Sequence, residues 1–206
     1  MQQTMKMGTF SGQEVWYLEP HRTEIIESDL YEHLQNQGRY AGAIKVSILF
    51  HSALCVELAQ RENHTPEVVA YCAAHDLHEA YVGDIPSPLK QVLPEFGERI
   101  ERPWEEHVHR SLGMLYPPPA ERMVPEKVKH IDLRALVVES TMCGHPLAND
   151  IANRHGAASE DERRAFKHIR GMYDDRGQSY WLWCLVVHAL RDAGFTKLGG
   201  PEMYRP

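Results

Sequence analysis

Apolar side chains recur along this sequence at the spacing of an α-helix, and this period limits the possible folds more than any other feature. Ile26, Leu30 and Leu34 follow one another every four residues, and residues 36–38, with Asn and Gly, are expected to end that helix. We find no convincing run of strand residues and no internal repeat. The sequence therefore predicts an all-α protein, a single-domain helical bundle.

The further helices are expected between proline and glycine residues, at about 44–61, 66–83, 95–112, 125–143, 160–169 and 180–190. Thr65 should cap the second of them, and Ser159 with Glu162 forms a capping box. Pro103 should kink or divide the third. Residues 84–88 contain two prolines one residue apart and are expected to form a loop. The last helix is apolar almost all round, which favours a buried position, in the core or at an interface.

Composition excludes several classes of protein. A net charge of −7 over 206 residues disfavours a general nucleic-acid coat protein, and no run of ~18 apolar residues suggests a membrane span. The first ten residues lack the apolar run of a signal peptide, and the four cysteines show no CxxC spacing. We expect one cytoplasmic domain over residues 1–206, with a core at about 22–145 and a helical extension at about 146–206.

Two of the 13 histidines lie where a metal site can form. His75 and Asp76 are adjacent within one expected helix, His51 lies on the apolar stripe of the preceding helix, and Asp132 lies on the inner face of a later one. Two imidazoles and two carboxylates suit a divalent ion such as Mn, Fe, Co or Ni. Taken singly, an inward histidine is more often a core residue than a ligand, and Asp132 is also explained as an N-terminal or salt-bridged carboxylate. Two carboxylates buried together are costly unless something pairs with them.

The pattern H…HD…D, met by His51, His75-Asp76 and Asp132, resembles that of the HD-domain metal-dependent phosphohydrolases. The similarity covers roughly residues 7–143 and includes the segments GRYAG (38–42), HDLHE (75–79), AYVGD (80–84) and IPSPLK (85–90). It is closest to the small deoxynucleotide-directed branch, which contains 5′-deoxynucleotidases and phage-type dATP triphosphohydrolases. The resemblance implies His51, His75, Asp76 and Asp132 as ligands of a divalent metal ion.

The resemblance also implies roles for residues around these ligands. Glu79, one helical turn after His75, would act as general acid or base, with Asp84 as its companion. Arg39 would clamp phosphoryl oxygens, for which a guanidinium is well suited. Tyr40 would pack against the sugar and leave no room for a 2′-hydroxyl, although a tyrosine beside a core helix is usually a packing residue.

Two other residues are predicted to bind substrate from their position alone. Pro88 belongs to a stiff segment that either contacts the base or is an ordinary loop, and Lys90 supplies positive charge for an acidic substrate. His78 is extra to the family pattern, and we interpret it as a residue at the surface or behind the ligands. The other histidines, including 107, 109, 130, 145, 168 and 188, show no ligand spacing and are interpreted as surface or helix residues.

The expected function is metal-dependent hydrolysis of a phosphoester or phosphoanhydride bond in a 2′-deoxynucleotide. Release of triphosphate from a dNTP is slightly favoured over conversion of a dNMP to a deoxynucleoside. A catalytically silent HD domain that binds a nucleotide, and a helical interaction protein without metal, are the alternatives from other classes. The resemblance also implies a homo-oligomer, with no nucleic-acid or membrane partner. Metal identity, base preference and the role of residues beyond about 145 stay open.

Overall fold

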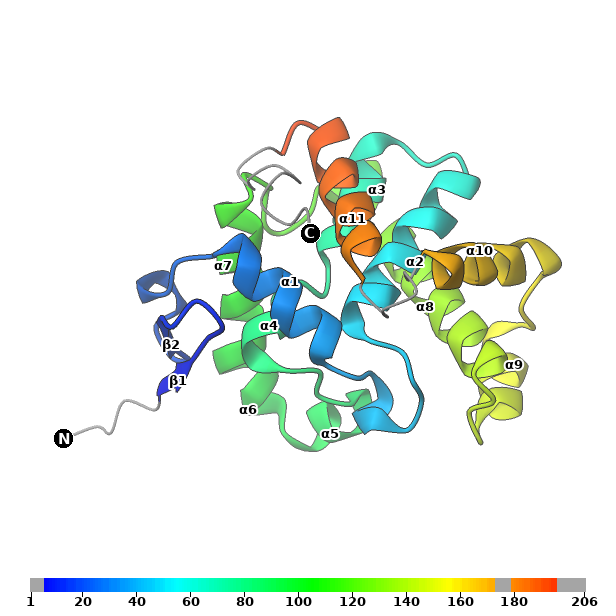
Figure 1. Ribbon diagram of the computed structural model, residues 1–206, viewed down its shortest axis with the longest axis horizontal. Helices are drawn as coiled ribbons and strands as arrows, with labels where there is room; N and C mark the ends of the chain where they lie inside the picture. Colours follow the sequence, from blue (N-terminus) through cyan, green and yellow to red (C-terminus); the bar gives the residue numbers. More distant parts are fainter. Residues whose placement is uncertain (1–5, 173–178, 196–206) are drawn as a thin grey trace.

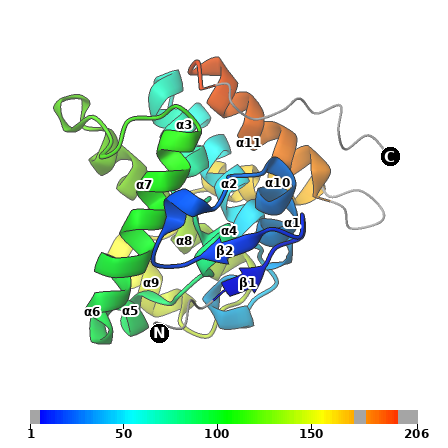
Figure 2. The ribbon, with the colours of Figure 1, turned by 90° about the vertical axis from the view of Figure 1, so that its left-hand side faces the viewer.

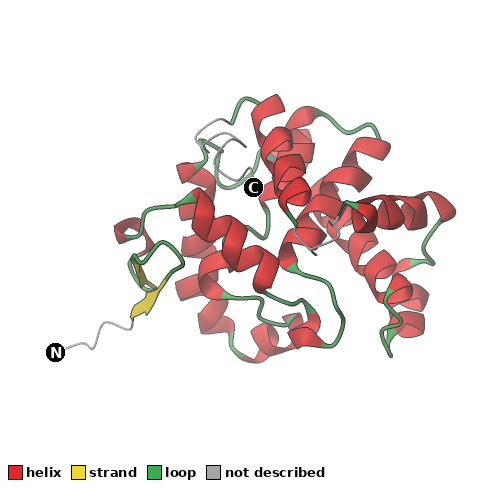
Figure 3. Ribbon diagram, viewed as in Figure 1, coloured by secondary structure: helices red, strands yellow, loops and turns green. Residues whose placement is uncertain are grey.

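The computed structural model describes residues 6–172 and 179–195. The rest of the predicted domain, residues 1–5, 173–178 and 196–206, lies outside the described residues. The helices are α1 (Glu27–Asn36), α2 (Ile48–Arg61), α3 (Pro66–Ala74), α4 (Glu79–Val82), α5 (Ser87–Val92), α6 (Pro94–Phe96), α7 (Arg102–Ser111), α8 (Val124–Met142), α9 (Ala148–His155), α10 (Glu160–Gly171) and α11 (Tyr180–Asp192). Figure 3 shows how completely helix dominates the described chain, which confirms the all-α prediction.

One small sheet departs from the expected absence of strands. β1 (Lys6–Gly8) and β2 (Glu14–Trp16) pair antiparallel, with Met7 opposite Val15. Each strand has three residues, which is too short for an alternating pattern to stand out in the sequence. Figure 1 shows this hairpin at the left edge of the helical body, and in Figure 2 it faces the viewer.

The core is organised around α2. Every residue from Ile48 to Ala59 is buried, and the helix packs against α1, α3, α8, α10 and α11 (Figure 1). The helix begins four residues later than expected, because the Ser47 side chain caps it by accepting from the Phe50 amide at 3.1 Å. An isolated bridge between Gly38 and Ser47 holds the preceding segment outside the helix.

The helix expected over 66–83 is two helices. Thr65 caps its start as predicted, but α3 ends at Ala74, and the chain makes a tight turn before α4. In this turn the Leu77 amide bonds to the Ala74 carbonyl and the Glu79 amide to the Asp76 carbonyl. Neighbouring residues of a regular helix point ~100° apart, so the turn is what frees His75 and Asp76 to face one point.

Two proline predictions have different outcomes. The loop expected over 84–88 is wrong in its last two residues, since α5 begins at Ser87 and Pro88 lies in its first turn, where the missing N–H costs nothing. The division expected near Pro103 is confirmed. There α6 and a π-helical turn (Gly97–Glu101) lead into α7, again with the proline in the first turn.

The C-terminal helices α9, α10 and α11 pack against the core helices α2, α3 and α8. The capping box of Ser159 and Glu162 begins α10 as predicted, while α9 was not anticipated. α11 packs on α3 and α2 with Leu182, Trp183 and Leu190 buried, so the expected burial is confirmed and the helix belongs to the core of this chain. Among the described helices none is both long and apolar enough to cross a membrane.

Candidate metal centre

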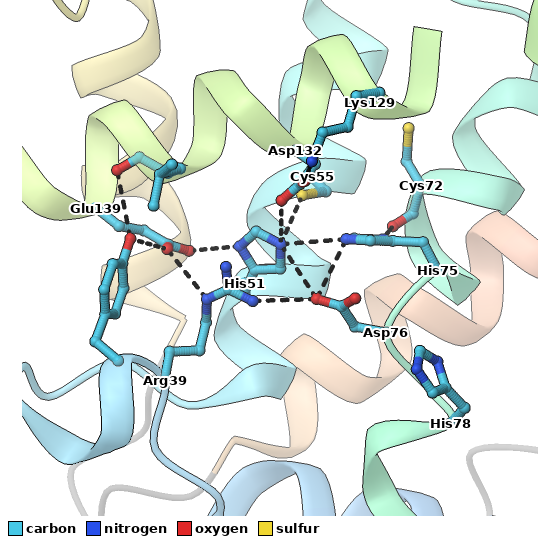
Figure 4. Close-up of polar contacts among 12 residues, drawn as sticks. Arg39, His51, Cys55, Cys72, His75, Asp76, His78, Lys129, Asp132 and Glu139 are labelled. Atoms are coloured by element: carbon cyan, nitrogen blue, oxygen red, sulfur yellow. Dashed lines mark hydrogen bonds and ion pairs between the residues drawn. The ribbon is translucent and has the colours of Figure 1, made fainter. Parts of the chain in front are cut away.

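Four side chains converge between α2, α8 and the turn after α3 (Figure 4). The Nε2 atoms of His51 and His75 lie 3.2 Å apart. Asp76 Oδ2 is 3.5 Å from His51 Nε2 and 3.3 Å from His75 Nε2, and Asp132 Oδ1 is 3.4 Å from His51 Nε2. The structure thus brings together all four predicted ligands, which we call the His–Asp cluster.

Hydrogen bonds behind the two imidazoles fix which ring nitrogen faces the cluster. Glu139 Oε1 lies 2.8 Å from His51 Nδ1, and the Cys72 carbonyl lies 2.8 Å from His75 Nδ1. Both partners are acceptors, so we assign the proton to Nδ1 in each ring, and Nε2 is left with its lone pair toward the cluster. The end of α3 makes the second bond possible, because it leaves the Cys72 carbonyl free of a helical amide. Metal-bound histidines are oriented by such outer bonds.

This donor set fits a divalent cation. Two acceptor nitrogens and two carboxylate oxygens meet within a few ångströms, and His51 is fully buried. Such an arrangement is unfavourable unless a cation or a proton lies among the lone pairs. Burial and the Arg39 cation lower the pKa of His51, but Cys55, Glu139 and Asp132 raise it well above the usual range. The cluster therefore attracts positive charge and can hold a metal ion.

A cysteine sulfur lies beside the His–Asp cluster. Cys55 Sγ lies 3.5 Å from His51 Nε2, and the ligand atoms of Cys55, His51 and His75 lie within 4.8 Å of one another. Cys55 was not predicted as a ligand from the sequence, because it lacks the CxxC spacing of paired thiolates. Its signal was the i, i+4 spacing from His51, which places both on one face of α2.

Arg39 lies against the carboxylates of the site. Its Nη1 donates to Asp76 Oδ2 at 3.1 Å, and its Nε lies 3.4 Å from Glu139 Oε2. Burial lowers the pKa of Arg39, but Glu139 and Asp76 more than offset this and raise it above its usual value. The guanidinium therefore stays charged and links a predicted ligand to the residue that orients His51.

Tyr40 and Glu139 form the outer wall of the centre. The Tyr40 hydroxyl donates to Glu139 Oε2 at 3.1 Å, and its ring lies 5.2 Å from the His145 ring. Glu139 thus accepts hydrogen bonds from His51 and Tyr40 and forms an ion pair with Arg39. No role could be assigned to this fully buried glutamate from the sequence, because a carboxylate seven residues after Asp132 is common on helix faces.

The side chains of Glu79 and Asp84 interact with the His–Asp cluster through their charges and form no hydrogen bond with the side chains of its four residues. Burial raises the pKa of Glu79 well above its usual range, and the nearby carboxylates of Asp76 and Asp84 raise it further. The pKa of Asp84 is raised as well, by burial first, although Arg39 opposes the shift. Both groups respond to Asp76 and Arg39, so both lie in the electric field of the centre.

The two remaining residues predicted to bind substrate, Lys90 and Pro88, differ in their surroundings. Lys90 Nζ donates to Glu101 Oε1, so its charge is already paired. Its pKa is raised, since Glu101, Glu79 and Asp76 outweigh the effect of burial. Pro88 is exposed in the first turn of α5 and has no recorded contact with the cluster.

A cavity of about 220 Å³ opens beside the cluster, and His75 and Asp132 form part of its wall. Its other lining residues are Tyr71, Glu105, His109, Pro118, Pro125, Val128 and Lys129. Lys129 Nζ donates to Asp132 Oδ2 at 2.8 Å, which leaves Oδ1 of that carboxylate facing His51. The cavity thus combines an apolar wall with a cation next to a predicted ligand.

Two histidines outside the predicted ligand set are buried. His78, interpreted as a residue at the surface or behind the ligands, and His109, interpreted as a surface or helix residue, both lie inside the protein. His78 lies in the turn between α3 and α4, where the end of the regular helix moves it inward. His109 faces the core from α7 and stacks on Tyr116.

Comparison with known proteins gives one informative relative and no functional name. No protein-family model matches the chain. The uncharacterized protein YfdR of Escherichia coli (strain K12) is 33% identical over 134 residues, which make up 64% of this chain and 68% of that protein. The chain therefore belongs to the same family as YfdR.

Proposed function

We propose that this protein is a metal-dependent phosphohydrolase of the HD-domain type that cleaves 2′-deoxynucleotides. A triphosphohydrolase that acts on a dNTP of the dATP type is favoured over a 5′-deoxynucleotidase. The observation that carries the proposal is the convergence of His51, His75, Asp76 and Asp132 on one point, with both imidazole Nε2 atoms turned toward it.

A divalent ion of the Mn, Fe, Co or Ni type, held by these four residues, supplies Lewis acidity toward a phosphoryl oxygen. Cys55 adds a soft donor, which favours Fe or Co over Mn. The centre is bordered by a fixed cation, Arg39, and phosphoryl transfer draws on positive charge placed where the phosphoryl oxygens develop charge.

Glu79 is the group best suited to move a proton. Its pKa is raised well above the usual range by burial and by Asp76 and Asp84, so it keeps a proton to higher pH than most glutamates do. Protonated Glu79 can donate to the leaving oxygen of the nucleotide. Asp84, which is more accessible, is the partner that takes the proton lost by the attacking water and returns it to Glu79.

The substrate is assigned to the cavity beside the cluster. At about 220 Å³ it is smaller than the ~300–1,000 Å³ of typical ligand pockets, so it accommodates part of a nucleotide. Val128, Pro118 and Pro125 offer an apolar surface for a base or sugar, and Lys129 an ammonium for a phosphate. The packing of Tyr40 on the sugar, and contacts from Pro88 and Lys90, stay predictions; Lys90 must first leave Glu101.

Compartment and assembly are part of the proposal. Four unpaired cysteines, three of them buried, agree with a reducing cytoplasm. We expect self-association into a homo-oligomer, which sedimentation of the purified protein measures directly.

A nucleotide panel tests the proposal. Protein loaded with Mn²⁺ or Co²⁺ is incubated with dNTPs, NTPs and dNMPs, and phosphate, pyrophosphate and triphosphate are measured separately. We expect triphosphate from dATP, lost in Asp76→Asn and kept in Asp150→Asn, a control at an exposed aspartate of α9. Phosphate from dNMPs alone would select the nucleotidase. Binding without any product would select the catalytically silent HD domain, and neither binding nor product would refute both.

A further inference from the structure

His78 is a buried imidazole without a hydrogen bond. It is only 5% exposed, and neither ring nitrogen has a hydrogen-bond partner among the described residues. Its nearest recorded polar contact is Glu101 Oε1, 3.7 Å from Nε2, which is beyond hydrogen-bonding distance. A buried polar group without a partner costs ~1–3 kcal/mol, so a feature of this kind needs an explanation.

Two carboxylates complete the environment of this imidazole. Glu79, the next residue, is 3% exposed, and its Oε2 is buried without a hydrogen-bond partner among the described residues. Glu101 approaches from the π-helical turn before α7. Ligand atoms of His78, Glu79 and Glu101 lie within 4.8 Å of one another, which is the spacing of ligands around one ion. One nitrogen and two carboxylate oxygens suit a borderline divalent cation.

We propose that His78, Glu79 and Glu101 bind a second divalent cation, of the Mn, Co or Zn class, next to the His–Asp cluster. The new site shares no ligand with the four residues of that cluster. Figure 4 shows His78 below Asp76 in the view, apart from the His51–His75 pair.

Lys90 is the internal competitor for this site. Its ammonium donates to Glu101, so a cation that binds Glu101 must displace it. The ammonium has no recorded bond to His78, and Glu79 Oε2 stays without a partner while Lys90 is in place, so Lys90 satisfies only one of the three groups. We therefore expect Lys90→Met to bind the second cation more tightly than the wild type does.

The site also deepens the proposed function, and this step rests on that proposal. Glu79 belongs to the proposed acid–base pair, and a cation on its carboxylate competes with a proton there. Filling the second site is therefore expected to slow nucleotide hydrolysis, while the His–Asp cluster supplies the catalytic ion.

Metal content measures the inference without reference to activity. Wild-type protein and variants are dialysed against Mn²⁺ alone, and bound metal per chain is determined by elemental analysis. We expect two ions in the wild type, and one in both His78→Gln and Glu101→Gln. His109→Gln and Glu95→Gln are matched controls, a buried histidine of α7 and an exposed glutamate of α6, and should keep two. Circular dichroism establishes that each variant is folded.

One ion per wild-type chain at saturation, or two ions in both His78→Gln and Glu101→Gln, would overturn the inference. The outcome is separate from that of the proposed function. Two ions in the wild type, with no turnover of any nucleotide by the wild type or by His78→Gln, would support this site and refute the phosphohydrolase, whereas turnover with one ion would do the reverse.

Discussion

Glu79 carries the most demanding role of any single residue in the proposed chemistry. Glu79→Gln is nearly isosteric and removes the proton-transfer capacity of the buried carboxyl, whose pKa is raised, and it leaves the four residues of the His–Asp cluster intact. General acid–base catalysis is typically worth ~10²–10⁴-fold, so kcat for dATP should fall within that range. Initial rates at saturating dATP measure it, and an unchanged kcat would make Glu79 a bystander of the reaction.

Cys55 permits a spectroscopic prediction at the same scale. Its sulfur lies 3.5 Å from His51 Nε2, close enough to coordinate an ion bound by that nitrogen. Protein loaded with Co²⁺ should absorb in the near-ultraviolet through sulfur-to-cobalt charge transfer. Cys55→Ser should lose this band, while Cys72→Ser should keep it, because Cys72 contributes its carbonyl to His75. A band that persists in Cys55→Ser would place the sulfur outside the coordination sphere.

The turn between α3 and α4 is the element on which the centre depends. It carries His75, Asp76 and His78 and leads into the short helix α4, which ends at Gly83, where φ is +82° and ψ is 157°. This backbone conformation is essentially restricted to glycine, and other residues held in it cost ~1–3 kcal/mol.

Gly83→Ala should therefore lower the free energy of unfolding by ~1–3 kcal/mol, as measured by urea denaturation. Gly97→Ala is the matched control. Gly97 starts a π-helical turn with φ of −59°, and an added Cβ meets only the Glu101 carboxylate at 3.8 Å. That substitution should be neutral or slightly stabilising. Equal effects of the two substitutions would show that the end of α4 is not constrained in this way.

Most of the helices could be predicted from the sequence, and the predictions that failed did so for physical reasons. Caps such as Thr65 and Ser159 act locally, so their helices begin where the sequence indicates. The break after Ala74 has no proline or glycine to mark it, and tertiary packing produces it. The four ligands followed from the family pattern. Cys55 had a local signal, its i, i+4 spacing from His51, whereas Glu139 and Glu101 are recruited by contacts distant in sequence, which periodicity does not encode.

At the scale of the whole molecule, a buried histidine links stability to pH. Burial, together with the neighbouring His78 and His75, lowers the pKa of His109 to about 3. In the unfolded chain a histidine titrates near ~6.5, so below that pH the unfolded state binds a proton that the folded state refuses. His109 therefore removes stability as pH falls from about 6.5 toward 3, by up to ~1.4 kcal/mol per pH unit, and has no such effect above.

His109→Phe removes this titration and keeps a ring to stack on Tyr116. The difference in unfolding free energy between variant and wild type should be constant above pH 7 and should shift in favour of the variant between pH 6 and 4. Urea unfolding at a series of pH values measures it. A difference that is independent of pH would mean that folded His109 accepts a proton as readily as the unfolded chain.

The central claim is that His51, His75, Asp76 and Asp132 bind a divalent metal ion, and metal content tests it most directly. Wild-type protein, His75→Ala, Asp132→Ala and the exposed control His155→Ala are dialysed against Mn²⁺ and analysed for bound metal per chain. The account predicts one ion fewer in His75→Ala and in Asp132→Ala than in the wild type, and no loss in His155→Ala. Equal metal content in all four proteins would contradict it.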